Sequence, residues 1–138
     1  MTRFVLDASV PLSWCFPDEH SDLAQEVADR FQRGDTAVAP SFWPHEVLNA
    51  LLAGEKRKRI SLGLVRAFLR DLAVLPVELH SLSAATVFVR LESLSRKHNL
   101  TVYDAAYLDL AIENGLALAT LDKQLAAACK DVKVGLLG

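Results

Sequence analysis

The chain has 138 residues, of which 51% are apolar and 23% are charged, and its formal net charge at pH 7 is −2. This length fits one domain, expected over residues 1–138, with a core that needs no disulfide or structural metal, and the charged fraction argues against intrinsic disorder. No apolar run reaches the roughly 18 residues of a membrane span, and the N-terminus lacks the apolar segment of a secretory signal, so a cytoplasmic protein is expected.

The first part of the chain predicts strands that alternate with helices. Residues 3–6 form a short apolar run that ends at Asp7, which indicates a buried strand. Residues 8–16 predict a short helix or turn, and residues 18–33 predict a helix because their apolar positions recur every four residues. A second short apolar strand is expected at residues 36–40.

Two further helices follow, and the sequence offers a cap for each. Ser41 is expected to cap a helix that has Pro44 in its first turn and runs to about residue 59. Ser61 is expected to cap the next helix, and residues 76–80 predict a weak third strand.

The remainder of the chain continues the alternation. Thr101 and Gly115 stand where a helix N-cap and a helix C-cap belong, and Asp122 can cap a last short helix. The expected segments are helices over residues 83–98, 102–113 and 122–129 and strands over residues 116–119 and 132–134. Short apolar strands between helices indicate a three-layer α/β/α fold with a central, mostly parallel sheet of four to five strands.

Four acidic residues stand where a solvated helix face is not expected. Asp7 directly follows the first strand, and Asp122 lies just beyond the strand at residues 116–119. Asp104 lies in the first turn of a helix, and Glu46 lies early in a helix rich in apolar residues. Because open α/β sheets bind ligands at the carboxyl ends of their strands, these acids are candidates to meet there. Each also has an ordinary role open to it, as a helix cap, a partner of the helix dipole or a solvated acid.

Bringing four carboxylates together is unfavourable without a compensating charge. Two carboxylates about 5 Å apart repel by roughly 3 kcal/mol at an effective dielectric constant of about 20. A divalent cation reverses the sign, and oxygen ligands suit Mg²⁺ or Mn²⁺, which bind few protein carboxylates and keep several waters. Such a site can activate a water and stabilise charge on a phosphodiester. The pattern therefore predicts a metal site with phosphodiesterase chemistry.

The segments around these acids carry a family resemblance. They are VLDAS at residues 5–9, WPHEVLNAL at 43–51, TVYDAAYL at 101–108 and ATLDKQL at 119–125. At these segments the sequence resembles the PIN-domain family, specifically the VapC-type toxins of bacterial and archaeal toxin–antitoxin pairs, in order and spacing over nearly the whole chain. One departure is Asp109, where the family more often has a small or apolar residue. Asp109 lies about 1.4 helical turns after Asp104, so we expect it to be structural or solvated.

The resemblance implies cleavage of RNA that depends on Mg²⁺ or Mn²⁺, with transfer RNA as the expected substrate class. It also implies a cognate antitoxin that covers the cleft, and a homodimer. Asp7 and Asp104 are the expected first metal ligands, Asp122 would bind a second ion or reach the first through water, and Glu46 would orient water or metal. The full expected set is Asp7, Glu46, Asp104 and Asp122 as catalytic and metal-binding residues, with Ser9, Thr120 and Asn49 in support.

A run of basic residues leaves two interpretations open. Residues 55–70 contain Lys56, Arg57, Lys58, Arg59, Arg66 and Arg70 against one acid, Glu55. Such a face on a slightly acidic protein is compatible with bound RNA. The same run is also favourable simply because cations stabilise the negative end of a helix dipole.

Three other functions compete with the nuclease. A zinc peptidase is suggested by His45 and Glu46, but the second histidine of its motif is replaced by Asn49. A phospho-acceptor receiver domain would need an aspartate at the end of the strand at residues 76–80, and none is there. A PIN fold that binds RNA or a partner without cleavage remains open, although all four acids are present.

Overall fold

The computed structural model, which describes residues 2–19 and 21–138, is built on a sheet with strand order β3-β2-β1-β4. The strands are β1 (Arg3–Leu6), β2 (Thr36–Pro40), β3 (Val77–His80) and β4 (Leu118–Ala119). All three pairings are parallel, with Val5 opposite Val38 and Leu6 opposite Ala119. The expected parallel sheet of four to five strands is confirmed, with four strands in the described part of the chain.

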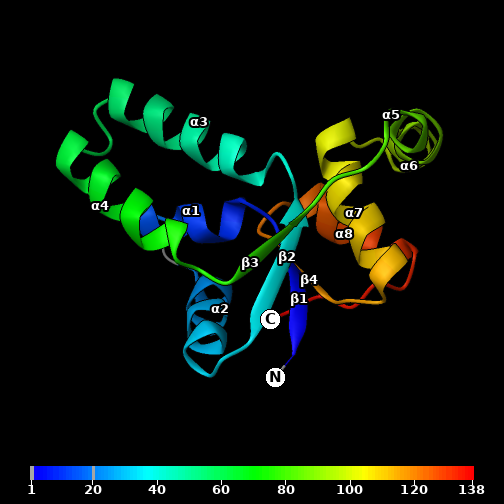
Figure 1. Cartoon of the computed structure of the whole chain (residues 1–138), viewed down its shortest axis with the longest axis horizontal. Coiled ribbons are helices and arrows are strands. Elements are labelled where there is room, and N and C mark those ends of the chain that lie inside the picture. Colours follow the sequence, from blue (N-terminus) through cyan, green and yellow to red (C-terminus); the bar gives the residue numbers. More distant parts are fainter. Residues whose placement is uncertain (1, 20) are drawn as a thin grey trace.

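Helices cover both faces of this sheet (Figure 1). On one side lie α1 (Ser9–Cys15), α2 (Asp22–Gln32), α3 (Trp43–Lys56) and α4 (Leu62–Ala73). On the other lie α5 (Ala84–Thr86), the π-helical turn η1 (Val87–Leu91), α6 (Glu92–His98), α7 (Val102–Asn114) and α8 (Lys123–Asp131). Right-handed crossovers explain why the helices divide between the two faces of the sheet. The chain moves in one direction across the sheet from β1 through β2 to β3, and then in the opposite direction to β4, so its later helices lie on the other face. The predicted three-layer α/β/α architecture is confirmed.

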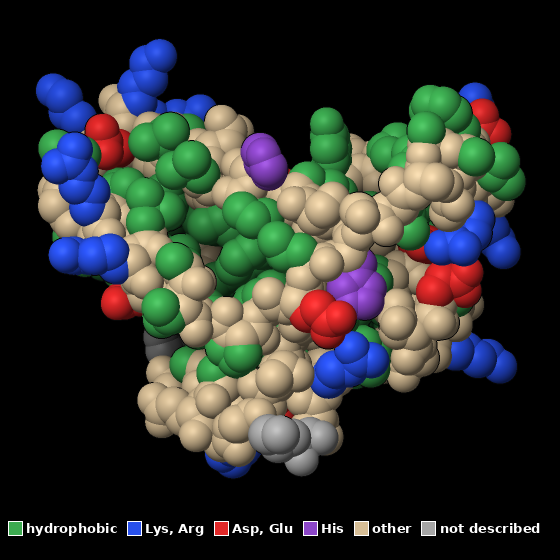
Figure 2. Space-filling view, in the orientation of Figure 1, with side chains coloured by type: hydrophobic (Ala, Val, Ile, Leu, Met, Phe, Trp, Pro, Cys, Tyr) green, Lys and Arg blue, Asp and Glu red, His purple; other side chains and the backbone are tan. Residues whose placement is uncertain are grey.

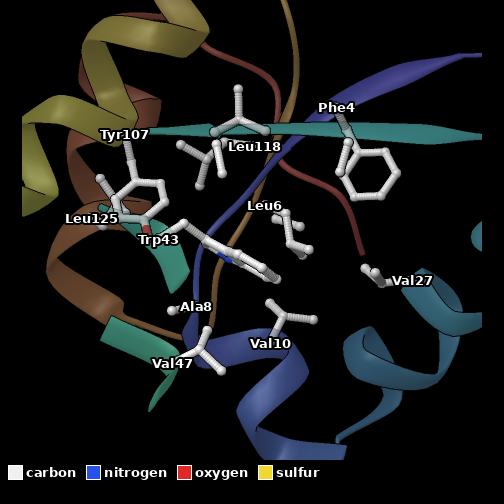
Figure 3. Close-up of a cluster of buried hydrophobic side chains, with 14 of the residues drawn as sticks. Phe4, Leu6, Ala8, Val10, Val27, Trp43, Val47, Tyr107, Leu118 and Leu125 are labelled. Carbon is white, nitrogen blue, oxygen red and sulfur yellow. The ribbon is translucent and has the colours of Figure 1, made fainter. Parts of the chain in front are cut away.

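The core lies between the sheet and its two helical layers. Phe4, Val5 and Leu6 of β1 are buried, as the sequence of a strand covered on both faces predicts. Figure 3 shows their neighbours from other elements, including Trp43 of α3 and Tyr107 of α7. Both cysteines, Cys15 and Cys129, are free and buried. Among the helices of the described residues, none has the length and apolar character needed to cross a bilayer.

Three of the predicted helix N-caps and the predicted C-cap at Gly115 are present. The Leu64 N–H donates to Ser61 Oγ at 3.2 Å, the Asp104 N–H to Thr101 Oγ1 at 3.1 Å and the Leu125 N–H to Asp122 Oδ1 at 2.9 Å. Gly115 ends α7 with φ of 63°, a left-handed conformation that glycine adopts without strain.

The predicted cap at Ser41 is wrong. The N-cap of α3 is Phe42, which makes no side-chain capping bond. The Ser41 N–H instead donates to the His80 carbonyl at 2.8 Å, so this residue still extends the pairing of β2 with β3. Pro44 in the first turn has no N–H to satisfy, which lowers the need for a cap.

The predicted strand at residues 132–134 is also wrong. Lys133 has φ of 61°, and the Val134 N–H donates to the Cys129 carbonyl at 2.8 Å, so these residues form the turn that ends α8. The chain reaches the sheet edge slightly later, where Leu136 makes an isolated parallel bridge with Leu118. The alternation of apolar residues correctly indicated that the chain returns to the sheet after α8. It predicted the pairing at residues 132–134, whereas the observed bridge is at Leu136.

Gly54 marks a close approach of α3 to Phe16, the residue that caps the end of α1. A Cβ atom at this position would lie 2.5 Å from Phe16 Cε1 and 2.7 Å from its Cζ. The Phe16 ring has little room to move, because it is buried and lies under the Arg59 guanidinium, 4.5 Å from the ring centroid. We expect Gly54→Ala to lower the free energy of unfolding by about 1–2 kcal/mol despite the helix propensity of alanine.

Gly63→Ala is the matched control, and urea unfolding would measure the stability of both variants. Gly63 is exposed on α4, and a Cβ atom at this position would meet no neighbouring side chain within 4 Å. Gly63→Ala should therefore stabilise the fold by about 0.5 kcal/mol, as alanine does in an open helical position. Equal unfolding midpoints for the two variants would contradict the close packing at Gly54.

Candidate active site

Asp7 lies at the carboxyl end of β1 and is held by two hydroxyl groups. Its side chain is buried, and Oδ2 accepts hydrogen bonds from Ser9 Oγ and Thr120 Oγ1, each at 2.7 Å. The same hydroxyl oxygens accept from the next backbone amides: Leu121 N–H to Ser9 Oγ and Asp122 N–H to Thr120 Oγ1, both at 3.0 Å. Ser9 and Thr120 thus fix the Asp7 carboxylate and join the ends of β1 and β4.

Glu46 lies in the first turn of α3, where a buried tyrosine holds it. The Tyr107 hydroxyl donates to Glu46 Oε1 at 2.5 Å. The Tyr107 ring is fully buried and meets Phe42 edge-on, with centroids 5.8 Å apart. Among the described residues, Glu46 Oε2 makes no hydrogen bond. One carboxylate oxygen is therefore fixed, while the other remains available.

Asp104 and Asp122 sit at helix beginnings. Asp104 is half-buried in the first turn of α7, where the positive end of the helix dipole favours a carboxylate. Asp122 is the N-cap of α8 and uses Oδ1 for the cap. The structural role that the sequence left open for Asp122 is therefore real, and its second oxygen has no hydrogen bond within the described residues.

Electrostatic repulsion links these four acids. Burial raises the pKa of Asp7, and the Asp122 carboxylate raises it further, although the Ser9 and Thr120 hydroxyls oppose the shift. Burial likewise raises the pKa of Glu46 and of Asp104. Asp7 and Asp104 add to the shift of Glu46, and Asp122 and Asp7 add to that of Asp104. Carboxylates from four separate segments therefore act on one another across one region of the molecule.

The chemistry of these donors fits a hard divalent cation. All are carboxylate oxygens, three of the acids have pKa values raised by burial and mutual repulsion, and none of the four forms an ion pair with lysine or arginine in the described part of the chain. As they stand, no three His, Cys, Asp or Glu side chains of residues 2–19 and 21–138 are arranged to hold a metal ion. Binding would therefore need side-chain rotation or bridging waters, which Mg²⁺ commonly keeps.

Two other positions considered in the sequence, Asn49 and Asp109, make no hydrogen bond or ion pair with these four acids among the described residues. Asn49 is exposed on α3 and, among the described residues, makes no hydrogen bond to any of the acids, so its supporting role stays a prediction. Asp109 is structural: it is buried, and Arg90 Nε and Nη2 donate to its two carboxylate oxygens at 2.9 and 2.8 Å.

Tyr107 was not predicted as a site residue. It lies three residues after Asp104, so the two share one face of α7. A signal was available, because a tyrosine among the apolar residues of a buried helix needs a partner for its hydroxyl. Its partner, Glu46, is 61 residues away, and spacing alone does not identify it.

Tyr107→Phe should lower the free energy of unfolding by about 1–2 kcal/mol, because it leaves a half-buried carboxylate without its donor. Tyr103→Phe is the matched control. Tyr103 also packs edge-on against Phe42, with centroids 5.2 Å apart, but it is exposed and its hydroxyl makes no hydrogen bond in the described residues. That control should change stability by less than about 0.5 kcal/mol. Urea unfolding that gives both variants the same stability would argue against the Glu46 contact.

Comparison with known proteins agrees with this architecture. The model of the PIN domain family matches residues 4–131, so the chain belongs to the PIN-domain family. It is similar to Ribonuclease VapC3 of Pyrobaculum aerophilum, with 33% identity over 124 residues that cover 90% of this chain and 92% of that protein. The predicted relationship to VapC proteins is confirmed.

Solved structures share the fold at lower sequence identity. PAE2754 from Pyrobaculum aerophilum has a TM-score of 0.67 and 19% identity, covering 92% of this chain and 84% of that one. A chain of a toxin–antitoxin complex from Klebsiella pneumoniae has a TM-score of 0.58 and 16% identity, covering 89% and 90%. At these identities, the comparison establishes the fold alone.

Proposed function

We propose that this chain is a ribonuclease that depends on Mg²⁺ or Mn²⁺ and acts as the toxin of a toxin–antitoxin pair. The observation that carries the proposal is the mutual repulsion of Asp7, Glu46, Asp104 and Asp122, acids from four segments that have no basic partner in the described residues. A bound cation or protonation relieves repulsion of this kind. The 33% identity to Ribonuclease VapC3 supports the choice of RNA as substrate.

Each residue has a distinct role in this proposal. Asp7 and Asp104 would hold the ion, and Asp122 would hold a second ion or reach the first through water. A bound Mg²⁺ or Mn²⁺ supplies an activated water and stabilises charge on the phosphodiester. Glu46 would orient the attacking water with its free oxygen, because Tyr107 fixes the other. Ser9 and Thr120 would keep Asp7 in place through their hydrogen bonds.

Metal removal tests this function directly. We expect purified protein to cleave transfer RNA in Mg²⁺, to lose at least about 10²-fold of that rate in EDTA, and to recover it on addition of excess Mg²⁺ or Mn²⁺. Circular dichroism in EDTA would verify that the loss is not unfolding. Cleavage that persists unchanged in EDTA would contradict the metal mechanism, and a folded protein that binds but never cleaves RNA would favour the silent alternative.

We further propose a cognate antitoxin and a second copy of this chain as partners in the cytoplasm. The toxin–antitoxin complex with the same fold supports the first. An apolar groove of about 260 Å³ between α3, α4 and β3, lined by Val47, Leu69, Leu72 and Leu79 among others, supports a protein partner (Figure 2). Size-exclusion chromatography with light scattering would check the homodimer, and a monomer at all concentrations would contradict it.

A further inference from the structure

The hairpin of α3 and α4 carries a group of exposed basic side chains at and near its outer end, where blue side chains gather in Figure 2. We call this group the basic tip; it consists of Lys56, Arg57, Lys58, Arg66 and Arg70. None of the five forms an ion pair with a described residue. Arg59, beside them, differs because it pairs with Asp18 at 3.1 Å and Glu19 at 2.6 Å. The basic tip therefore holds positive charge that no acid of residues 2–19 and 21–138 pairs with.

A groove joins the basic tip to the acidic cluster. It has a volume of about 390 Å³ and is lined by residues of α1, of α3 and of the segments that follow α1, α3 and β4. Ser9 and Asp122 of the site and Arg57 of the tip are among them, as are Arg59 and Glu19, which pair with each other. Arg57 follows Glu46 by eleven positions, which corresponds to about 16 Å along α3. Gly54 keeps α3 close to Phe16 in the wall of this groove. Asp122 of the acidic cluster and Arg57 of the basic tip thus line one continuous groove.

We propose that a single RNA strand leaves the acidic cluster along this groove and that its phosphates bind the basic tip, beginning at Arg57, the residue of the tip that lines the groove. The inference rests on the proposed ribonuclease function. An RNA strand continues beyond the bond that is cut, so the adjoining surface must accept further phosphates. On a chain with net charge −2, a local excess of cations favours the binding of a polyanion. The apolar walls, such as Leu12 and Ala50, suit unstacked bases of a single strand.

The salt dependence of RNA binding tests this path. Asp7→Asn, which should bind without cutting, would be titrated into a fluorescein-labelled single-stranded RNA in Mg²⁺ at several salt concentrations, with anisotropy as the readout. Adding Arg57→Gln should weaken binding several-fold and reduce the slope of log K against log salt by about 0.7, the value for one phosphate of a single strand. Replacing Lys56 and Lys58 by Gln as well should reduce the slope by about 2 in total.

The matched control is Arg96→Gln in the same Asp7→Asn background. Arg96 is also an exposed helical arginine, but it lies on α6, across the sheet from α3 (Figure 1). An equal slope and affinity for Arg57→Gln and Arg96→Gln would overturn the proposed path and leave the ribonuclease function intact if the parent protein still cleaves. A parent protein that neither binds nor cleaves RNA would overturn the function itself.

Loss of binding to a polyglutamate peptide in the tip variants, with RNA binding unchanged, would assign the tip to an acidic protein partner and also overturn the path.

Discussion

Asp7→Asn is expected to reduce RNA cleavage by about 10²–10³-fold without destabilising the fold. The activity should fall because Asp7 would be a direct ligand of the ion, and the charge stabilisation supplied there is equivalent to several kcal/mol of barrier. Stability should stay the same or rise in EDTA, because burial raises the pKa of Asp7 and its ionised form therefore opposes folding. The asparagine oxygen can still accept the Ser9 and Thr120 hydrogen bonds.

Initial rates of transfer RNA cleavage would measure the loss of activity. Urea unfolding in EDTA would measure the change in stability. Asp71→Asn is the matched control, since it removes an exposed aspartate from α4, outside the acidic cluster. Asp71→Asn should leave the cleavage rate unchanged and should change the free energy of unfolding by less than about 0.5 kcal/mol. Lost activity together with a large loss of stability would show that Asp7 acts as a structural residue, and unchanged activity would remove it from the catalytic set.

Arg90→Met is expected to lower the free energy of unfolding by about 3 kcal/mol, because it leaves the Asp109 carboxylate buried without its partner. Arg90 lies in η1 and donates to both Asp109 oxygens, and its Nη1 also contacts Glu113 at 2.9 Å. We place the effect at the lower end of the range for buried pairs because the Arg90 side chain is 41% exposed, whereas that of Asp109 is 6% exposed.

The double variant Arg90→Met/Asp109→Leu provides the decisive comparison. It removes both charges, so urea unfolding should show most of the lost stability restored. Arg96→Met is the control for removing an exposed ion pair, since Arg96 and Glu92 are 3.9 Å apart and both solvated, and it should change stability by less than about 0.5 kcal/mol. A double variant less stable than Arg90→Met alone would indicate that Asp109 has another role.

The predicted and observed helices differ at the segment that carries this ion pair. The sequence predicts a helix over residues 83–98, and the chain is helical there, but η1 interrupts it with a π-helical turn that contains Arg90. Helical periodicity reports only the local pattern of apolar residues. The widened turn lies where Arg90 reaches Asp109, 19 residues later, and such a tertiary contact leaves no mark on the spacing.

The candidate site was predictable to the extent that local sequence encodes it. A strand ending in Asp7 and a helix cap at Asp122 are local patterns, and the parallel sheet brings them to one edge. Glu46 and Asp104 were candidates from their positions near helix beginnings, and the family resemblance supported both choices. The Tyr107 hydrogen bond was missed because its two partners belong to different helices, and only the packed structure brings them together.

The hydrogen bonds around Asp7 also help to hold β4, the edge strand of the sheet, in place. β4 is only two residues long and pairs with β1 through its backbone. The loop that follows β4 is anchored by two further hydrogen bonds, from the Leu121 N–H to Ser9 Oγ and from the Asp122 N–H to Thr120 Oγ1. The hydroxyl groups that orient a candidate catalytic carboxylate are thus also anchors for the segment that leads into α8. Amide hydrogen exchange at residues 121 and 122 should therefore slow when an ion or substrate immobilises Asp7, which gives ligand binding a readout independent of any chemical turnover.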